Sequence, residues 1–546
     1  MLNIISNRTS QLERGFRDLL ALIAISCLLL FPVFALAQVD ESPSGPVVEI
    51  AQGRLQGTAN EISQLFLGVP YAAAPIGELR WKAPQSAPQW EGTRQAVQFG
   101  PSCPQPFNLL FADVGEQSED CLYLNVWTPD VQQRNLPVIV FIHGGAFRYG
   151  SASQSVYDGS ALAAKGNVVV TFNYRLGVLG FLAHPELSAE SGTGSSGNYG
   201  LLDQIAALRW VEENIRQFGG NPGNVTLMGE SAGAVSICAL MSSPLAEGLF
   251  DKAIVMSGGA PDRLRFLDSP RNGLQSMQEI GEEWATRNMD RLGLEDFSAL
   301  RRVDWREIQG SGNVSPLRTD FDIVNMMSMD DSICIDGYVL QESPAEVFAA
   351  GRQARIPVMA GSLRNEGGMF TLGLRFRSLS QYENMMAGIF GIHASLAVNL
   401  YPATDTELAL SQLTSFISDG FGAGAREIVD SMKSIDTESW LYRFDYESPA
   451  ARLTGVGTFH GSELPYFFGT FPIKIAYGRG SELLSERIGD YLCNFARSGN
   501  PNADGLLYWP QFDDETEALM QINLPMSAGT VERSAQYDLI EQSGLW

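Results

Sequence analysis

The residue best placed to do chemistry is a serine in a glycine-rich pentapeptide, Gly229-Glu230-Ser231-Ala232-Gly233. This segment matches G-x-S-x-G, in which a serine on a sharp strand-to-helix turn acts as a nucleophile. A chance match is expected about 0.5 times in a chain of this length and composition, so the motif is weak when taken alone. An ordinary glycine-rich turn is the alternative interpretation, and the flanking elements must decide between the two.

A serine is a poor nucleophile without a neighbouring base, and the sequence contains 4 histidines. His460 follows an apolar strand predicted at Trp440–Phe444 and lies among turn-forming residues. A late histidine on a loop fits a chain order in which the nucleophilic serine comes first, the acid second and the histidine last. His184, which precedes Pro185, is expected on a loop, and His393 lies in a predicted insertion. For each histidine, a packing or surface role is the alternative.

A second glycine-rich turn, His143-Gly144-Gly145-Ala146-Phe147, comes directly after a predicted buried strand. Such a turn aims backbone N–H groups at a reacting oxygen and so predicts an oxyanion hole.

The acid of a catalytic triad would lie between Ser231 and His460. Glu366 follows a strand predicted at Ile356–Met359, and a carboxylate on a loop just past a strand can fix the tautomer of an imidazole. Asp322, Asp336 and Asp419 are its competitors, but none has the same strand–loop setting.

The elements that must position these residues alternate between strands and helices. Continuous apolar runs are typical of strands that are covered on both faces, as in a parallel sheet. Apolar residues at spacings of three and four predict an amphipathic helix over Gly200–Phe218. Strands are predicted at Leu136–Ile142, Asn167–Phe172, Val225–Met228, Ala253–Met256 and Ile356–Met359, with a helix from Ala232. This alternation favours an α/β fold with a large, mostly parallel central sheet.

Two stretches break the pattern and are predicted to be insertions. Residues 262–331 are rich in charge and poor in strand signals, and residues 372–436 look mainly helical. Both fall between core strands, so we expect them over one edge of the sheet, at the rim of the active site. The Gly/Ser segment Gly192–Gly197 lacks the following Lys-Ser/Thr of a phosphate-binding loop and is expected to be a connector.

The composition is that of an ordinary globular protein of 546 residues, and it excludes wholesale disorder. Lys and Arg number 37 against 62 Asp and Glu, a net charge of −25. This balance argues against nucleic acid or an anionic membrane surface as a partner, because both require a basic face.

The N-terminus has the pattern of an export signal. Arg8, Arg14 and Arg17 precede an apolar run over 19–34, and Ala35-Leu36-Ala37 is typical of a cleavage site. Cleavage after Ala37 would leave residues 38–546 as a single domain, with a net charge of −26, in a secreted or periplasmic location. An uncleaved membrane anchor is the alternative, because the apolar run is of borderline length.

Export implies an oxidising compartment, so the cysteines are informative. Cys27 would leave with the signal. Cys103 and Cys121 are close in sequence and form the natural pair, whereas Cys238, Cys334 and Cys493 lie in apolar contexts and are expected to be buried. No spacing of Cys and His predicts a metal site.

Taken together, the sequence resembles the type-B carboxylesterases, the α/β-hydrolases that include cholinesterases and many bacterial esterases. The resemblance runs from about Pro46 to Trp509 and keeps the order of the family's motifs. The segments that carry it are Phe66–Ala72, Glu119–Asn125, His143–Phe147, Asn173–Arg175, Asn198–Gln204, Gly229–Gly233, Asn365–Gly367 and His460–Tyr466.

The resemblance implies a serine esterase with Ser231 as nucleophile, Glu366 as acid and His460 as base. It also implies an oxyanion hole from the N–H groups of Gly145, Ala146 and Ala232.

The resemblance extends to the scaffold. The pair Cys103–Cys121 matches the family's first disulfide. Two buried ion pairs are expected as well, Arg80 with Glu119 and Arg175 with Asp203.

The sequence departs from the cholinesterases where they bind choline. Their tryptophan between the first two cysteines is absent, and only Phe107 and Phe111 stand in that stretch. We therefore expect a general esterase of the bacterial type, acting on a small-molecule ester without metal or organic cofactor. The alternatives are a non-catalytic adhesion protein on the same fold, which the retained triad positions argue against, and an amidase or lipase variant.

Overall fold

The computed structural model describes residues 45–108, 111, 113–271, 273–309 and 332–545. The predicted export signal over 1–37 and the candidate Asp322 lie outside these residues.

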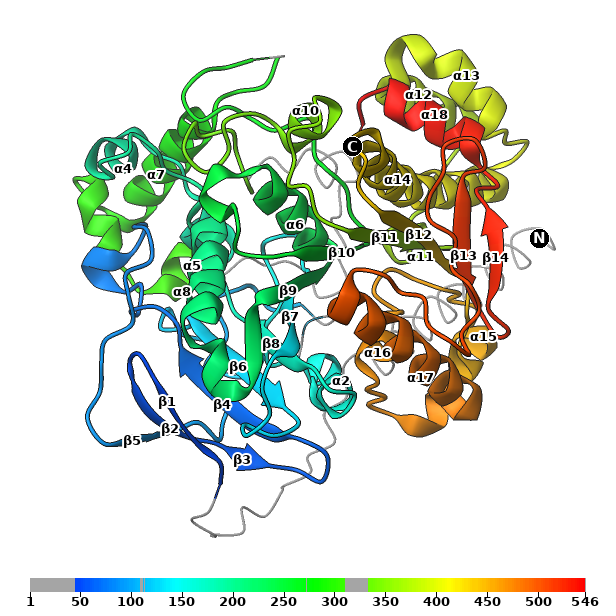
Figure 1. The fold of residues 1–546 in the computed structure, drawn as a ribbon. Coiled ribbons are helices and arrows are strands. Elements are labelled where there is room, and N and C mark those ends of the chain that lie inside the picture. Colours follow the sequence, from blue (N-terminus) through cyan, green and yellow to red (C-terminus); the bar gives the residue numbers. More distant parts are fainter. Residues whose placement is uncertain (1–44, 109–110, 112, 272, 310–331, 546) are drawn as a thin grey trace, which may run out of the picture.

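A sheet of eleven strands crosses the molecule, in the order β14-β13-β12-β11-β10-β9-β7-β8-β6-β4-β3 (Figure 1). The seven strands from β8 to β13 are parallel, and the pairs at both ends are antiparallel. The strands are β3 Thr58–Ala59, β4 Gln64–Pro70, β6 Tyr123–Thr128, β7 Leu136–Ile142, β8 Val168–Phe172, β9 Gly220–Glu230, β10 Lys252–Met256, β11 Val358–Leu363, β12 Ser439–Phe444, β13 Ala518–Ile522 and β14 Ser527–Thr530.

A small second sheet lies at the N-terminal end of the described chain. It consists of β1 Val47–Ile50, β2 Gly53–Gln56 and β5 Thr93–Gln95. Strands β1 and β2 form an antiparallel hairpin, in which Ile50 pairs with Gly53.

Helices cover both faces of the large sheet. The α-helices are α2 Ser160–Ala164, α3 Gly177–Phe181, α4 Pro185–Glu190, α5 Tyr199–Asn214, α6 Ala232–Ser242, α7 Met277–Leu292, α8 Trp305–Ile308, α10 Pro344–Ala349, α11 Gly367–Phe370, α12 Leu379–Phe390, α13 Ala394–Leu400, α14 Thr406–Ser434, α15 Pro449–Thr454, α16 Leu464–Phe468, α17 Lys474–Ser498 and α18 Ser534–Gln542. The 3-10 helices are η1 Gly77–Leu79, η3 Ser155–Tyr157, η4 Ile215–Phe218, η5 Pro244–Ala246, η6 Phe297–Arg302 and η7 Gly391–His393.

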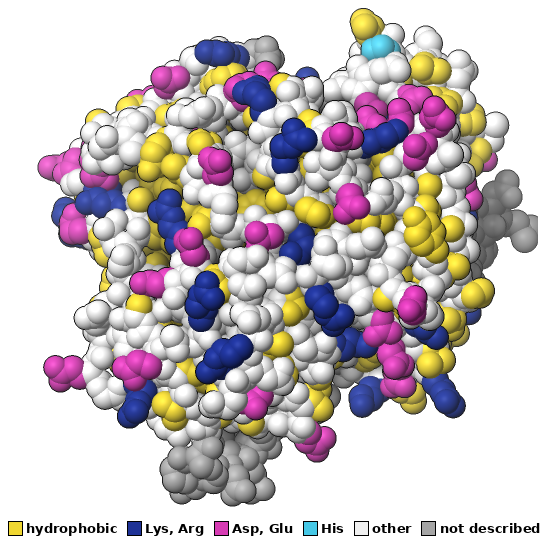
Figure 2. Space-filling view, in the orientation of Figure 1, with side chains coloured by type: hydrophobic (Ala, Val, Ile, Leu, Met, Phe, Trp, Pro, Cys, Tyr) yellow, Lys and Arg dark blue, Asp and Glu magenta, His cyan; other side chains and the backbone are white. Residues whose placement is uncertain are grey.

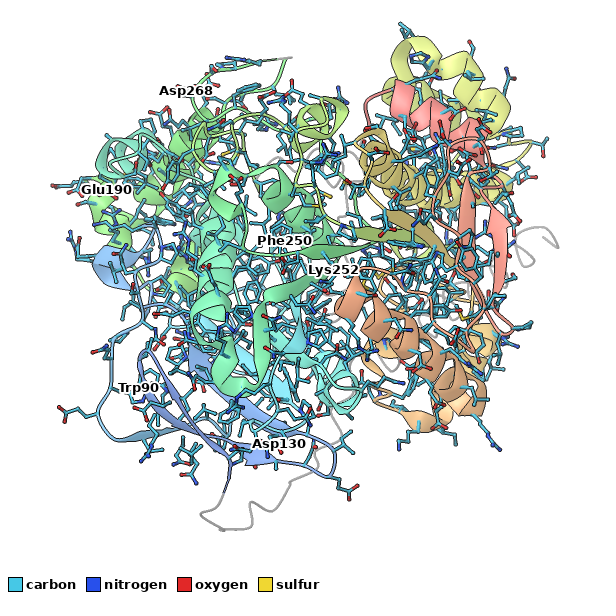
Figure 3. The ribbon with its side chains drawn as sticks, viewed as in Figure 1. Trp90, Asp130, Glu190, Phe250, Lys252 and Asp268 are labelled. Carbon is cyan, nitrogen blue, oxygen red and sulfur yellow. A yellow bond between two sulfur atoms is a disulfide. The ribbon has the colours of Figure 1, made fainter. Side chains whose placement is uncertain are left out.

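The central strands are buried on both faces, as their continuous apolar runs predict. In β7, Val138 and Val140 enter one hydrophobic core, which also contains residues of α5, α6 and α14. Ile139 and Phe141 point to the opposite face and enter a second core with α2, α16 and α17. Figure 3 shows side chains filling the space on both sides of the sheet, near Phe250 and Lys252. This layering is the predicted α/β architecture, a mostly parallel sheet with helices on both faces.

Some elements differ from the sequence-based expectations. Strand β11 begins at Val358 and extends to Leu363, beyond the predicted end at Met359. The predicted helix over 200–218 is α5 followed by the 3-10 turn η4. The short strands β13 and β14 were not predicted, because a five-residue run at a sheet edge leaves little periodicity to read.

The first predicted insertion, residues 262–331, contains the helices α7 and α8. The second, residues 372–436, contains α12, α13 and α14. Helix α14 is not confined to an edge, however. It contributes Ile428 and Val429 to the main core beneath β11 and β12. Its C-terminal half therefore belongs to the layer that covers the sheet.

The two predicted ion pairs are both formed. Arg175 contacts Asp203 with side-chain exposures of 3% and 0%, and Arg80 contacts Glu119 with exposures of 4% and 12%. The first pair is fully buried, whereas the second reaches solvent at Glu119.

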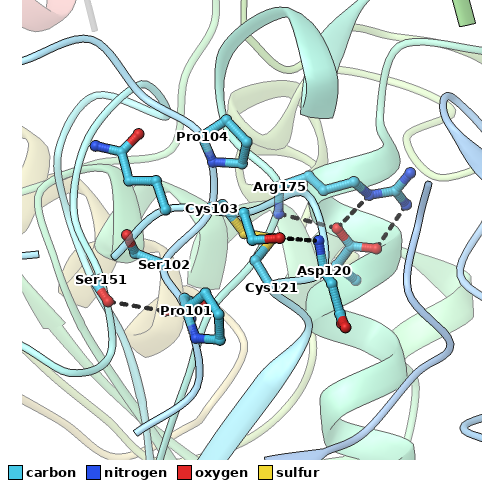
Figure 4. Close-up of a disulfide and its surroundings, with 12 residues drawn as sticks. Pro101, Ser102, Cys103, Pro104, Asp120, Cys121, Ser151 and Arg175 are labelled. Carbon is cyan, nitrogen blue, oxygen red and sulfur yellow. Dashed lines mark hydrogen bonds and ion pairs between the residues drawn. A yellow bond between two sulfur atoms is a disulfide. The ribbon is translucent and has the colours of Figure 1, made fainter. Parts of the chain in front are cut away.

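The cysteines divide as expected from their contexts. Cys103 and Cys121 are joined by a disulfide, which lies near Arg175 (Figure 4). Cys238, Cys334 and Cys493 are buried and free.

On the surface shown in Figure 2, Lys and Arg side chains are interspersed with Asp and Glu, with apolar side chains between them. Within the described residues, no helix is both long and apolar enough to cross a membrane.

Candidate active site

The candidate nucleophile occupies the turn between β9 and α6. Strand β9 ends at Glu230, α6 begins at Ala232, and Ser231 between them has φ 56° and ψ −121°. A non-glycine residue in this region is strained and persists only where its surroundings hold it. The N–H of Ser231 donates to the Met256 carbonyl oxygen at 2.9 Å, which ties the turn to β10. The strand–turn–helix context that the motif requires is therefore present.

The glycines of the motif are explained by close contacts. A Cβ atom on Gly233 would stand 2.0 Å from the carbonyl oxygen of Ile142, so only glycine lets α6 pass this near to β7. A Cβ on Gly144 would stand 2.5 Å from Glu230 Oε2 and 3.0 Å from Ser231 Cβ. The loop after β7 thus lies directly against the serine turn.

The candidate acid Glu366 is wholly buried just after β11. Its Oε2 accepts a hydrogen bond from His460 Nδ1 at 2.6 Å. Its Oε1 accepts from Ser257 Oγ at 2.6 Å and from the Leu363 N–H at 2.8 Å. Three donors on two oxygens fix the carboxylate, and the carboxylate in turn fixes the imidazole.

The competing acids are engaged elsewhere. Asp336 accepts a hydrogen bond from Ser195, and Asp419 accepts from Tyr401 and pairs with Arg533. Of the candidates within the described residues, Glu366 alone contacts His460.

The candidate base His460 is 7% exposed, on the loop before α16. Its Nε2 has no hydrogen-bond partner among the described residues and lies 3.2 Å from Glu230 Oε1. Burial lowers the pKa of His460, but the negative charges of Glu230 and Glu366 outweigh it and raise that pKa. Because Glu230 immediately precedes Ser231, its contact with His460 brings the base to the serine turn.

Two aromatic rings pack against the imidazole. The Phe421 ring of α14 lies 4.8 Å from the His460 ring between centroids, and the Phe370 ring of α11 lies 5.1 Å away. The two phenylalanines also stack on each other at 5.8 Å. This apolar wall limits the orientations open to the imidazole.

The candidate oxyanion loop follows β7. Gly145, Ala146 and Phe147 have φ angles of 109°, 53° and 58°, so three consecutive residues adopt positive φ. Neither the Gly145 nor the Ala146 N–H is paired within the described part of the chain. Ala232 is the first residue of α6, where backbone N–H groups have no intrahelical acceptor. These three amides are thus open to an oxyanion.

The remaining histidines have other roles. His184 caps α4 by accepting from the Glu186 N–H, and it stacks on Phe297 with centroids 3.9 Å apart. His393 ends the 3-10 turn between α12 and α13. In the residues that the structure describes, no cluster of His, Cys, Asp and Glu has the arrangement of a metal site.

Sequence reasoning missed two buried carboxyl groups beside the triad residues. Glu230 is 5% exposed, and burial raises its pKa to about 7 while His460 opposes the rise. Glu463 is wholly buried with neither oxygen hydrogen-bonded to the described residues, and burial raises its pKa well above the ordinary value. Glu230 lies within the motif of Ser231, and Glu463 lies within the segment that begins at His460. Their positions inside these motifs are the sequence signal that could have identified them.

Comparisons with known proteins identify the family of this chain. The profile of the "Carboxylesterase family" matches residues 44–540. The chain is 37% identical over 481 residues to fumonisin B1 esterase of Sphingopyxis macrogoltabida, covering 86% of this chain and 84% of that protein. It is 36% identical over 482 residues to para-nitrobenzyl esterase of Bacillus subtilis (strain 168), covering 86% and 93%.

Solved structures show the same relationship. A PNB esterase superposes with a TM-score of 0.76 at 32% identity, over 92% of this chain and 100% of that one. A carboxylesterase of Geobacillus stearothermophilus superposes with a TM-score of 0.74 at 31% identity, over 90% and 99%. The α/β-hydrolase layering, the serine turn and these relatives lead to one conclusion: the chain belongs to the carboxylesterase family and is a carboxylic ester hydrolase.

Proposed function

We propose that this protein hydrolyses esters through an acyl-enzyme formed on Ser231, with His460 as general base and Glu366 as the acid that orients it. The observation that carries the proposal is the 2.6 Å contact between His460 Nδ1 and Glu366 Oε2. A carboxylate on Nδ1 keeps the proton there, so Nε2 has a free lone pair for the serine proton. The 3.2 Å contact between Nε2 and Glu230 supports a base that faces the serine turn.

In the first half of the reaction, Ser231 Oγ attacks the ester carbonyl carbon while His460 Nε2 takes the hydroxyl proton. The carbonyl oxygen becomes an oxyanion, which the N–H groups of Gly145, Ala146 and Ala232 stabilise by hydrogen bonds. The imidazolium then gives its proton to the leaving alcohol as the bond between the carbonyl carbon and the alkoxy oxygen breaks. The acyl group remains on Ser231.

In the second half, His460 takes a proton from water, and the hydroxide attacks the acyl carbon. The same three amides hold the second oxyanion. The imidazolium returns its proton to Ser231 Oγ as the carboxylic acid leaves. In the resting site Nε2 makes no hydrogen bond to the described residues, and catalytic hydrogen bonds of this kind tighten when substrate binds.

We further propose that the substrates are neutral esters with small or medium acyl groups and that residues 38–546 form one domain, exported after cleavage following Ala37. The apolar wall of Phe370 and Phe421 beside the base supports an uncharged acyl group. The charge and length pattern of residues 1–37 supports export. N-terminal sequencing of the protein from the culture fluid or periplasm should begin at Gln38, and an intact Met1 would contradict the cleavage.

The catalytic assignment is tested by Ser231→Ala. This variant should lose more than 99.9% of the turnover of a small neutral ester, because loss of a triad member typically costs about a million-fold. Ser242→Ala is the matched control, because Ser242 ends the helix that Ser231 precedes and its Oγ donates to the Cys238 carbonyl oxygen. Residual activity of Ser231→Ala above about a thousandth of wild type would point to another nucleophile.

A further inference from the structure

We infer that the side chain of His143 is a positioning residue for the oxyanion hole, because its hydrogen bond to the Gly144 carbonyl oxygen turns the Gly144–Gly145 peptide so that the Gly145 N–H faces the reacting oxygen. This inference rests on the proposed function and adds a residue that the triad does not include.

The hydrogen bond fixes the tautomer of His143. Its Nδ1 lies 2.8 Å from the Gly144 carbonyl oxygen. A carbonyl oxygen only accepts, so Nδ1 carries the hydrogen and Nε2 carries the lone pair. The ring is 1% exposed, and burial lowers its pKa to about 4, so it is neutral at ordinary working pH.

The same hydrogen bond orients the next amide. The carbonyl and the N–H of one trans peptide point to opposite sides. A Gly144 carbonyl held by the His143 ring therefore directs the Gly145 N–H away from that ring. Gly144 itself lies against Ser231, and the Gly145 N–H is unpaired within the described residues. The donor is thus left free on the side where an oxyanion forms.

The loop requires such a support because its backbone is strained. Ala146 and Phe147 have φ angles of 53° and 58°, a region that costs a non-glycine residue of order 1 kcal/mol or more. The Gly177 N–H holds the far end by donating to the Phe147 carbonyl oxygen at 2.7 Å. The His143 ring holds the near end.

The His143 ring is itself fixed in place. It stacks on Tyr174 with centroids 4.5 Å apart and planes 20° apart. The Tyr174 hydroxyl donates to the His143 carbonyl oxygen at 2.9 Å. A Cβ on Gly150 would stand 2.5 Å from His143 Nδ1, so the backbone at Gly150 also packs closely against the ring. Because the ring is held in this way, its hydrogen bond fixes the orientation of the Gly144–Gly145 peptide.

Three substitutions separate the hydrogen bond from the packing. His143→Phe keeps a flat ring against Tyr174 but removes the donor. His143→Asn removes the ring but keeps an N–H donor near the position of Nδ1. His143→Leu has nearly the shape of Asn without the donor, so Asn and Leu form a matched pair even if the Phe variant does not fold.

We expect His143→Leu and His143→Phe to lower kcat about 10- to 100-fold with KM nearly unchanged, somewhat less than the loss of a whole oxyanion donor. His143→Asn should recover most of kcat. The affinity for a trifluoromethyl ketone, which forms a hemiketal oxyanion on the serine, should fall in the Leu and Phe variants by the same factor as kcat/KM. Active-site titration with an organophosphonate normalises each rate to folded protein.

A packing role alone predicts the reverse order, with Phe active and Asn impaired. That order, or equal kcat for Asn and Leu, or unchanged trifluoromethyl ketone affinity in the Leu variant, would overturn the inference. The proposed function is tested apart from this by Ser231→Ala. If that variant is inactive while the Leu and Phe variants keep wild-type kcat, only the role of His143 has failed.

Discussion

Glu230 and His460 are 230 residues apart in sequence, yet Oε1 of Glu230 lies 3.2 Å from Nε2 of His460. That nitrogen is the one that would take the proton of Ser231. With Glu366 on Nδ1, the imidazole stands between two carboxyl groups at 7% exposure. A neighbouring negative charge stabilises the imidazolium, both in the resting site and in the transition state.

Glu230→Gln should move the acid limb of the pH profile of kcat/KM to lower pH. The imidazolium cannot accept the serine proton, so activity falls as the pH drops through the pKa of His460. Glu230 and Glu366 raise that pKa, and removing one charge lowers it by up to about one pH unit. The profile is measured with a neutral ester between about pH 5 and 9.

Glu427→Gln is the matched control for this shift. Burial raises the pKa of Glu427 to about 7, as it does for Glu230, but the charges around Glu427 are Glu541, Asp262, Arg426 and Asp430. Its removal should leave the acid limb in place. If the acid limb of Glu230→Gln stays at the wild-type pH or moves to higher pH, Glu230 and His460 have no direct electrostatic link.

Glu366→Gln should lower kcat about 10³- to 10⁴-fold, because the amide can hold the wrong tautomer and does not stabilise the imidazolium. Asp336→Asn and Asp419→Asn are the controls, since each carboxylate pairs elsewhere. Steady-state kinetics on one neutral ester compares the three variants. If either control loses more activity than Glu366→Gln, the residue changed in that control is the acid of the triad.

The elements that carry the candidate site could be predicted from the sequence because their signals are local. The motif around Ser231 lies between a strand and a helix, Glu366 follows a strand and His460 lies on a late loop, and the structure brings these elements to one edge of the sheet. Both ion pairs that the resemblance implied are formed, and the pair of Arg175 with Asp203 is fully buried.

The features that the sequence did not predict depend on contacts between segments that are distant in the chain. Phe421 packs against His460 from a helix that begins at Thr406, and no local pattern marks it. Glu463 is wholly buried, whereas a glutamate read from sequence alone is expected at the surface. Helix α14 was assigned to an insertion because its periodicity does not reveal which layer its apolar face covers.

Arg175→Met should lower the free energy of unfolding by about 3–5 kcal/mol, because Asp203 would remain buried without its partner. Arg352→Met is the surface control. Arg352 and Glu342 are 51% and 41% exposed, so solvent screens their attraction and the loss should be much smaller than for Arg175→Met. Denaturant unfolding measures both. Equal costs for the two substitutions would mean that burial does not set the strength of the Arg175 pair.

Neutral esters should be hydrolysed without preference for choline esters. A cation is held by an aromatic face that is open to it. In the loop from Cys103 to Cys121, Phe111 stacks on Tyr149 at 5.4 Å, and Phe107 is 65% exposed to solvent. The comparison is kcat/KM for a choline ester and its dimethylbutyl isostere at high salt, which screens steering by the net charge of −25. A choline advantage of about tenfold, equal to about 1.4 kcal/mol, would reveal a cation site.

The measurement that tests the catalytic assignment most directly is the mapping of a covalent organophosphonate adduct by peptide mass spectrometry. The probe reacts with a serine only where a base and an oxyanion hole activate it. The account predicts one adduct, on Ser231, with ester hydrolysis lost in step with labelling and no adduct in Ser231→Ala. An adduct on another residue, or hydrolysis that survives complete labelling of Ser231, would contradict it.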